Sequence, residues 1–265
     1  MNATSTTAGA AAAPARLRVN RISGEDPWRW LAGGWQDLWR APKPALLMGV
    51  VFWLLSLALA ATLLSVDALA LLLPMAGGFF LVGPFLAIGL YELGRRLERG
   101  EAVGPGVVFR PRIAAPTQVG LLAALLLFAH FVWVRIALLL FALFFGVHRE
   151  LPPLETFIHD LFFTPQGLTL LAVGTAVGGV FALVTYAGTV IALPLLFDRD
   201  VDAFSAIALS VRAVRENPGP MLLWAWLIVM IAGFGIAIGF VGLIIAFPLL
   251  GLASWRAYRA LVAEG

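Results

Sequence analysis

The chain has 265 residues, of which 61% are apolar and only 12% are Asp, Glu, Lys or Arg. Soluble domains carry about a quarter charged residues, so this composition excludes a water-soluble globular fold and indicates an integral membrane protein. The absence of cysteine excludes disulfide scaffolds, iron–sulfur clusters and thiol catalysis, and three histidines are too few for a haem–copper core. The net charge of +3 comes from basic residues that flank apolar segments, which is typical of membrane loops and argues against a nucleic-acid partner.

The N-terminal region is predicted to lie outside the membrane core. Residues 1–15 are mostly Ala, Thr and Ser without charge, lack the features of a signal peptide and are expected to form a disordered tail. The segment 16–43 begins with basic, extended residues and continues as an amphipathic helix, with Asp26 as N-cap and Pro27 in the first turn. Its apolar stripe has helical spacing and consists of Trp28, Leu31, Trp35, Leu38 and Trp39. This stripe faces either the bilayer interface, where Trp is enriched, or the protein's own core.

The remaining chain, 44–262, is predicted to be a membrane domain. Apolar segments of spanning length lie at about 45–66, 68–92, 117–146, 168–197, 220–238 and 240–260. The last two come from one apolar run that, as a single helix, would be about 52 Å long and so exceed a ~30 Å membrane core. Glycines at 233, 235, 239 and 242 predict a tight hairpin within this run, and a bent or half-inserted pair is the alternative.

The distribution of basic residues favours the count of six spans. With the N-terminus in the cytoplasm, 16 of the 18 basic residues lie on the cytoplasmic side. Only Arg149 lies outside, and Arg135 lies within a span. The positive-inside rule therefore predicts six transmembrane helices with both termini cytoplasmic.

A Gly-x5-Pro motif recurs in the even-numbered spans. Its three copies are Gly78 to Pro84, Gly188 to Pro194 and Gly242 to Pro248. This internal repeat predicts an all-α fold of three kinked hairpins around a shared centre, with interfacial amphipathic helices. Chance is the alternative, because Gly and Pro are common in membrane helices. The middle unit departs from the pattern, since the Gly- and Pro-rich segment 104–116 leaves little room for an intact helix.

Two polar residues fall inside the predicted third span. Arg135 indicates either a substrate or lipid-phosphate contact, or a side chain that snorkels or forms a structural ion pair near the outer boundary. Its possible partners are Asp67, Glu155 and Asp160. His130 faces another side of the same helix, where a hydrogen bond to a neighbouring helix is expected and a proton relay or metal site is the alternative.

Other ionisable residues cluster outside the spans. Asp198, Asp200 and Asp202 end the fourth span, either as structural helix-end and N-cap residues or as an acid–base or cation site. Glu92 is expected to pair with Arg95 or Arg96. The outer loop 147–166 is expected to be solvated, with a divalent metal site as the alternative, and it contains His148, Glu150, Glu155, His159 and Asp160. No catalytic motif, cofactor or metal site is predicted.

Five stretches carry a resemblance to a known family. They are 27–42 (PWRWLAGGWQDLWRAP), 81–101 (LVGPFLAIGLYELGRRLERGE), 142–147 (ALFFGV), 195–225 (LLFDRDVDAFSAIALSVRAVRENPGPMLLWA) and 242–262 (GLIIAFPLLGLASWRAYRALV). Over about residues 18–262 the chain resembles the bacterial membrane proteins known as domain of unknown function 2189. The resemblance implies a multi-pass bacterial inner-membrane protein, and it implies no reaction.

The sequence favours a non-enzymatic scaffold, assembly or envelope factor. We expect its partners to be the lipid bilayer and a membrane protein or a second copy of the chain. The alternative is a small-molecule, ion or lipid transporter or channel, which kinked helices and an intramembrane Arg would fit. A lipid-handling enzyme that uses the outer loop or the Asp198 cluster is the least supported interpretation.

Overall fold

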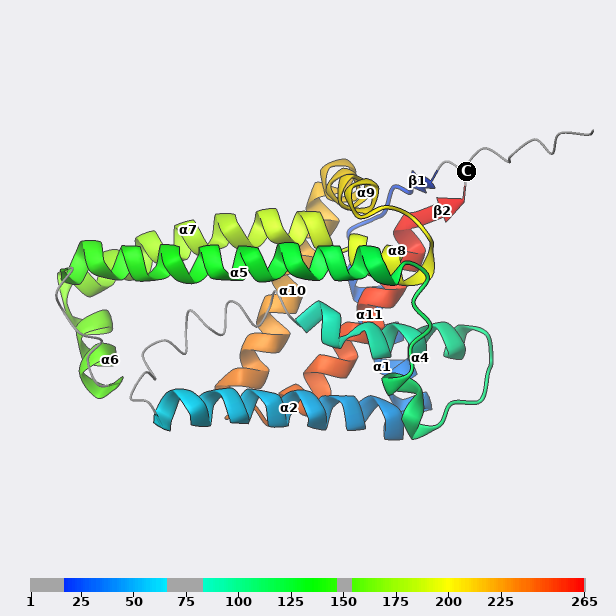
Figure 1. Ribbon diagram of the computed structural model, residues 1–265, viewed down its shortest axis with the longest axis horizontal. Coiled ribbons are helices and arrows are strands. Elements are labelled where there is room, and N and C mark those ends of the chain that lie inside the picture. Colours follow the sequence, from blue (N-terminus) through cyan, green and yellow to red (C-terminus); the bar gives the residue numbers. More distant parts are fainter. Residues whose placement is uncertain (1–16, 66–82, 147–153, 265) are drawn as a thin grey trace, which may run out of the picture.

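The computed structural model describes residues 17–65, 83–146 and 154–264 (Figure 1). The α-helices are α1 (Asp26–Arg40), α2 (Pro42–Ser65), α4 (Ile88–Glu98), α5 (Pro116–Phe145), α6 (Leu154–Phe163), α7 (Pro165–Thr189), α8 (Ala192–Asp198), α9 (Ala203–Glu216), α10 (Pro218–Ala237) and α11 (Leu243–Leu261). The other described elements are a 3₁₀-helix, η2 (Pro105–Phe109), and two short strands, β1 (Leu17–Val19) and β2 (Val262–Glu264). The chain is therefore helical almost throughout these ranges, as its composition predicts.

Proline residues set the starts of several long helices. Helices α2, α5, α7 and α10 begin at Pro42, Pro116, Pro165 and Pro218. Proline suits the first turn because the amide that it lacks would have no partner within the helix. Helix α7 also has a side-chain cap, since the Thr164 hydroxyl accepts a hydrogen bond from the Gly167 amide at 3.0 Å.

The prolines of two Gly-x5-Pro motifs have different effects on their helices. Pro194 cannot donate to the carbonyl of Val190, and a turn interrupts the regular helix there, between the end of α7 and the start of α8. By contrast, α11 continues through Pro248. Helix α2 approaches α11 one turn earlier, where a Cβ built on Gly49 would lie 2.0 Å from the carbonyl oxygen of Ile244. Only glycine permits this approach between the two helices.

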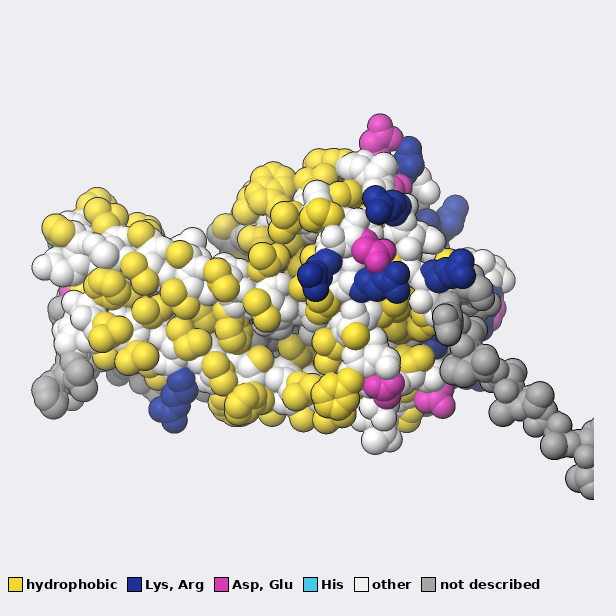
Figure 2. Space-filling view, turned by 90° about the horizontal axis from the view of Figure 1, so that it is seen from above, with side chains coloured by type: hydrophobic (Ala, Val, Ile, Leu, Met, Phe, Trp, Pro, Cys, Tyr) yellow, Lys and Arg dark blue, Asp and Glu magenta, His cyan; other side chains and the backbone are white. Residues whose placement is uncertain are grey.

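The helices form an arm and a compact end. In Figure 1, α5 and α7 lie side by side along one edge, and we call these two helices the arm. Helix α6 lies at the far end of the arm, and α2 runs along the opposite edge. At the other end, α1, α4, α8 and the C-terminal half of α11 pack together. We call this region the charged end, because most of the charged side chains visible in Figure 2 gather there, whereas the arm is covered by apolar side chains.

The core of the charged end is built around α11. Its Trp255 packs against Tyr91 of α4 and Phe197 of α8, with ring centroids 6.3 and 5.7 Å apart. Close packing depends on small residues, since a Cβ on Gly251 would lie 2.5 Å from a methyl carbon of Leu90. The first and last described segments meet here too, because β1 pairs antiparallel with β2, with Val19 opposite Val262.

Four described helices are long and apolar enough to cross a membrane. They are Pro42–Ser65, Pro116–Phe145, Pro165–Asp198 and Pro218–Ala237. The predicted second span lies mostly outside the described residues. Helix α11 follows α10 after a turn in which Gly239 and Phe240 have positive φ angles of 72° and 66°. It carries Arg256 and Arg259 and is not one of the four candidates, so the count of six spans stays a prediction.

Three predictions about local structure are wrong. Asp26 is the first residue of α1 and not its N-cap, because its carboxylate instead accepts a hydrogen bond from the Ser23 amide at 2.6 Å. The segment 147–166, predicted to be an outer loop, is not simply a loop in its described part, because residues 154–163 form α6, whose Phe157 and Leu161 are buried against the arm. The predicted stripe of α1 is not one face, as Leu38 is buried whereas the tryptophans of the stripe are exposed.

Candidate functional site

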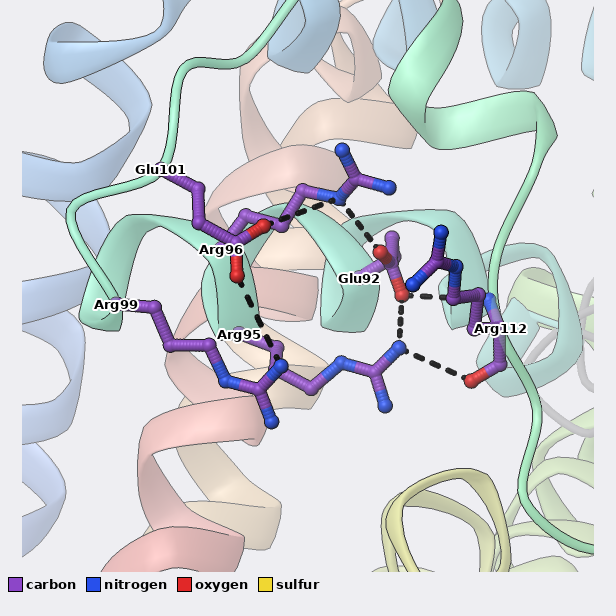
Figure 3. A network of polar contacts seen from close by, with 6 residues as sticks. All are labelled: Glu92, Arg95, Arg96, Arg99, Glu101 and Arg112. Atoms are coloured by element: carbon purple, nitrogen blue, oxygen red, sulfur yellow. Dashed lines mark hydrogen bonds and ion pairs between the residues drawn. The ribbon is translucent and has the colours of Figure 1, made fainter.

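Glu92 is the centre of a polar network on α4 (Figure 3). Only 2% of its side chain is exposed, and one carboxylate oxygen accepts a hydrogen bond from Arg96 Nε at 2.6 Å. The other oxygen pairs with Arg95 and accepts a hydrogen bond from the Arg112 amide at 3.3 Å. Arg95 also donates to the Arg112 carbonyl at 3.0 Å and lies 4.5 Å above the ring of Phe197. The predicted pairing of Glu92 is confirmed, and the network fastens the loop before α5 to α4.

A second buried carboxylate joins α1 to α11. Arg256 Nε donates to one oxygen of Asp37 at 2.6 Å, and its Nη2 donates to the other at 2.8 Å. The Asp37 side chain is only 4% exposed. Gly33 makes room for the guanidinium, since a Cβ there would lie 2.7 Å from its Nε. This pair could not be predicted from the sequence, because the two residues are 219 positions apart and neither lies in a motif.

Asp198 belongs to a cluster at the C-terminal end of α8. Its carboxylate accepts a hydrogen bond from the Tyr258 hydroxyl at 2.8 Å and lies 3.9 Å from the guanidinium groups of Arg199 and Arg259. Arg259 also contacts Glu98 of α4 at 3.3 Å. Burial raises the pKa of Glu98, although the positive charge of Arg259 opposes this shift. The cluster therefore ties α4, α8 and α11 together.

The other two acidic residues of the predicted cluster lie apart from Asp198. Asp202 caps α9, where its carboxylate accepts a hydrogen bond from the Ser205 amide at 2.8 Å. This hydrogen-bonding with Ser205 lowers the pKa of Asp202. Asp200 is exposed in the connection between α8 and α9. The structural interpretation of this segment is thus supported for Asp198 and Asp202, and the three carboxylates do not form one cation site.

Arg135 and His130 both lie on α5, Arg135 on its exposed surface and His130 on its partly buried side. Arg135 is exposed, and no ion pair joins it to another described residue. Of its suggested partners, Asp67 lies outside the described ranges and the Glu155 side chain is not described. His130 packs beside Phe131, with ring centroids 6.2 Å apart, and its Nδ1 is buried without a hydrogen-bond partner in the described structure. The expected hydrogen bond to a neighbouring helix is therefore not seen at this nitrogen.

An apolar cavity of about 770 Å³ lies between the arm and α10. Its lining is almost wholly apolar and includes Trp133, Phe141, Phe157, Tyr186, Trp226 and Ile228. None of Arg135, His130 and Asp198 is among the described lining residues. The cavity therefore offers no polar route for an ion past the candidate residues in the described part of the chain.

The described residues hold no group of three or more potential metal ligands. His159 is exposed and lies 3.8 Å from Asp160, whereas His148 and Glu150 of the proposed outer cluster lie outside the described ranges. The alternative of a divalent metal site gains no support from the described part of this cluster.

The residues of the three Gly-x5-Pro motifs lie in different parts of the structure. Pro84 lines the apolar cavity, and Gly78 lies outside the described residues. Gly188 lies near the end of α7, with Ile207 of α9 as its neighbour. Gly242 is the N-cap residue of α11 and packs closely on Gly235. These residues bend and join helices, and the internal repeat stays a prediction.

Asn217 is a further structural residue whose role the sequence analysis did not identify. It is 4% exposed, and its side chain accepts a hydrogen bond from the Ile22 amide at 2.9 Å and donates to the Asn20 carbonyl at 3.1 Å. Its signal in the sequence was its place before the Pro-Gly-Pro segment, which marks a helix junction. The polar side chains of the charged end thus mainly form hydrogen bonds and ion pairs that hold separate helices, strands and loops together.

The comparisons with known proteins identify a family and no individual relative. A family model described as a predicted integral membrane protein, DUF2189, matches residues 72–198. No curated protein and no solved structure matches the chain. The match covers α4 to α8 and confirms the family resemblance there, while the resembling stretches 27–42 and 242–262 lie beyond it. Residues 72–198 therefore match the DUF2189 family of predicted integral membrane proteins, a family of unknown function.

Proposed function

We propose that this protein is a non-enzymatic scaffold or assembly factor of the bacterial inner membrane. The observation that carries the proposal is the use of its buried carboxylates. Asp37 and Glu92 are the buried acidic side chains of the described chain, and both are satisfied by arginines of the same molecule. A group that is fully paired and fastens helices is poorly placed to bind substrate or transfer protons.

The proposal includes the finer topology. Six spans with both termini in the cytoplasm are supported by the distribution of basic residues, and three kinked hairpins are supported by the Gly-x5-Pro spacing. The natural chain has no cysteine, so single cysteines can be introduced without background. Cysteines at positions 100, 202 and 264 should react with a membrane-impermeant maleimide only after the cytoplasmic side is opened. Cysteines at 150 and 240 should react in intact cells, and protection of position 240 there would leave four or five spans.

A transporter is the competing function, and the apolar cavity is the observation that favours it. The cavity would suit an apolar molecule better than an ion, because its lining is almost wholly apolar. Reconstituted liposomes distinguish the two functions. The scaffold proposal predicts that fluxes of K⁺, Na⁺, H⁺ and phosphate, and the transbilayer movement of a fluorescently labelled lipid, equal those of empty liposomes. A saturable flux that Arg135→Leu abolishes would support transport and overturn the proposal.

The positive test measures the membrane proteome of a deletion strain. A scaffold or assembly factor should be needed for the normal abundance of particular membrane proteins. We expect some of these to decline on deletion and to recover with the wild-type chain and with Arg135→Leu. An unchanged membrane proteome, measured by quantitative mass spectrometry, would contradict the proposed role.

A further inference from the structure

Helix α1 has three distinct faces. One face packs on α11 and holds the buried Trp30, Gly34 and Leu38. A second face is polar, with exposed Arg29, Gln36 and Arg40. At 100° per residue, positions 28, 35 and 39 fall within about 40° of one another and form the third face. We call Trp28, Trp35 and Trp39 the tryptophan face.

The tryptophan face is unpartnered within the part of the chain that the structure describes. Trp28, Trp35 and Trp39 are 50%, 45% and 49% exposed, and the last two rings touch edge to face with centroids 5.6 Å apart. Single exposed apolar side chains are ordinary, but three indoles on one face form a contiguous patch that water solvates poorly. The core cannot take these rings, since the opposite side of α1 is already packed against α11.

The position of α1 in the chain identifies what this face meets. Helix α1 ends at Arg40, and α2, a candidate membrane span, begins at Pro42. The tryptophan face therefore occupies the helix directly before this span, and Trp39 lies three residues from its first residue. Exposed Arg40 and Lys43 flank that residue. Indole rings beside basic side chains at the end of a span are characteristic of the headgroup region of a membrane.

Helix α9 supplies an independent parallel. It also precedes a candidate span, α10, and it packs inward through small residues, namely Ala203, Ala206, Ser210 and Ala213. Its Phe204 is 67% exposed, next to polar Ser205. Two helices thus combine an inward face that packs on the protein with an outward aromatic side chain, and each of them directly precedes a candidate span.

We propose that the tryptophan face of α1 is seated in the phospholipid headgroup layer at the charged end of the protein. In this position Trp28, Trp35 and Trp39 lie at the boundary between headgroups and acyl chains, and the polar face of α1 points to water. The helix is then held on two sides, by α11 and by lipid. This arrangement goes beyond the proposed scaffold function and does not depend on it.

Fluorescence quenching tests the proposal in the intact chain. The protein is placed in nanodiscs of phosphatidylcholine and phosphatidylglycerol. Its tryptophan fluorescence is compared with that of a triple variant that carries Trp28→Phe, Trp35→Phe and Trp39→Phe together. The emission lost in the triple variant belongs to the three rings. We expect lipids brominated near the headgroup to reduce this component about two-fold, as befits interfacial indoles, and aqueous iodide to leave it almost unchanged. The single Trp→Phe variants give the same information one ring at a time if the triple variant does not fold.

Trp226→Phe is the matched control. Trp226 is 55% exposed and lies eight residues into the candidate span α10, so bromine deep in the acyl chains should quench it best. Two results would overturn the proposal. Red-shifted emission that iodide quenches would place the tryptophan face in water. Protection from both iodide and brominated lipid would show that a second copy or another protein covers it.

Discussion

Removal of Arg256 should loosen α1 far more than removal of its partner. Arg256→Met leaves the carboxylate of Asp37 in a site where its side chain is 4% exposed. An ionised group left unpaired in a protein interior costs about 3–5 kcal/mol. The lower figure applies here, because Arg40 remains 3.4 Å away on the solvent side. Asp37→Asn costs less, about 1–2 kcal/mol, because the Arg256 side chain is 32% exposed and water can solvate it.

Hydrogen exchange of the α1 amides measures this difference directly. A loss of about 3 kcal/mol corresponds to a roughly 10²-fold rise in the opening equilibrium of the helix, at about 1.4 kcal/mol per factor of ten. Arg256→Met should show this rise in peptides from residues 26–40, and Asp37→Asn a smaller one. The double variant Asp37→Leu, Arg256→Met should recover much of the protection, because neither charge is then left alone.

The control is Arg215→Met on α9. Arg215 is exposed and has no ion pair within the described part of the chain. Its removal changes the net charge equally but should leave α1 exchange unchanged. Equal exchange rates of the α1 amides in Arg256→Met and Arg215→Met would refute the claim that an unpaired Asp37 loosens α1. It would also be refuted if Asp37→Asn proved the more damaging change.

Three further predictions concern other parts of the molecule. Burial raises the folded-state pKa of Glu98 above its usual value of 4.5, so its contribution to stability is full below pH 4.5 and is lost as the pH rises through the raised pKa. The unfolding temperature of Glu98→Gln in detergent should therefore lose this part of its pH dependence. Equal slopes of unfolding temperature against pH for the variant and the wild type would refute the prediction. Gly49→Ala should lower the unfolding temperature markedly, because its Cβ would overlap a carbonyl oxygen of α11, whereas Gly233→Ala, with nothing within 4 Å, should be neutral or stabilising by about 0.5–1 kcal/mol. Arg135→Leu should leave the free energy of unfolding within about 0.5 kcal/mol of the wild-type value, as expected for an exposed residue without an ion pair to another described residue. A large loss would reveal a contact outside the described residues.

Local sequence signals predict the helix boundaries well. The starts of α5 and α10 lie at Pro116 and Pro218, within two residues of the predicted spans, because proline restricts the backbone wherever the rest of the chain lies. The pairing of Glu92 with Arg95 and Arg96 could also be predicted, since these residues share a helix face three and four positions apart. Such features depend on neighbours in the sequence and need no tertiary information.

The orientation of α1 could not be predicted in the same way. Helical spacing places Leu38 and Trp39 in one apolar stripe, yet the structure buries the first and exposes the second. An amphipathic helix between a protein core and a membrane has two apolar faces, and hydrophobicity alone does not separate them. Packing against α11 determines which apolar face of α1 is buried, since Gly33 and Gly34 let α1 approach α11 on one side only. The pair Asp37–Arg256 then fixes that side.

The same fastening explains how a chain with so few charges remains ordered at one end. The pairing of β1 with β2, the hydrogen bonds of Asn217 and the pair Asp37–Arg256 each join segments about 200 residues or more apart. Lipid gives apolar helices no hydrophobic reason to associate, so directional polar contacts and close glycine packing must hold them together. The arm has close glycine packing at Gly178 against Trp133, but no ion pair joins its helices within the described residues, and its α5 is mostly exposed along its length. The charged end is therefore held by contacts between distant parts of the chain, whereas the described arm is held mainly by apolar contacts with its sequence neighbours.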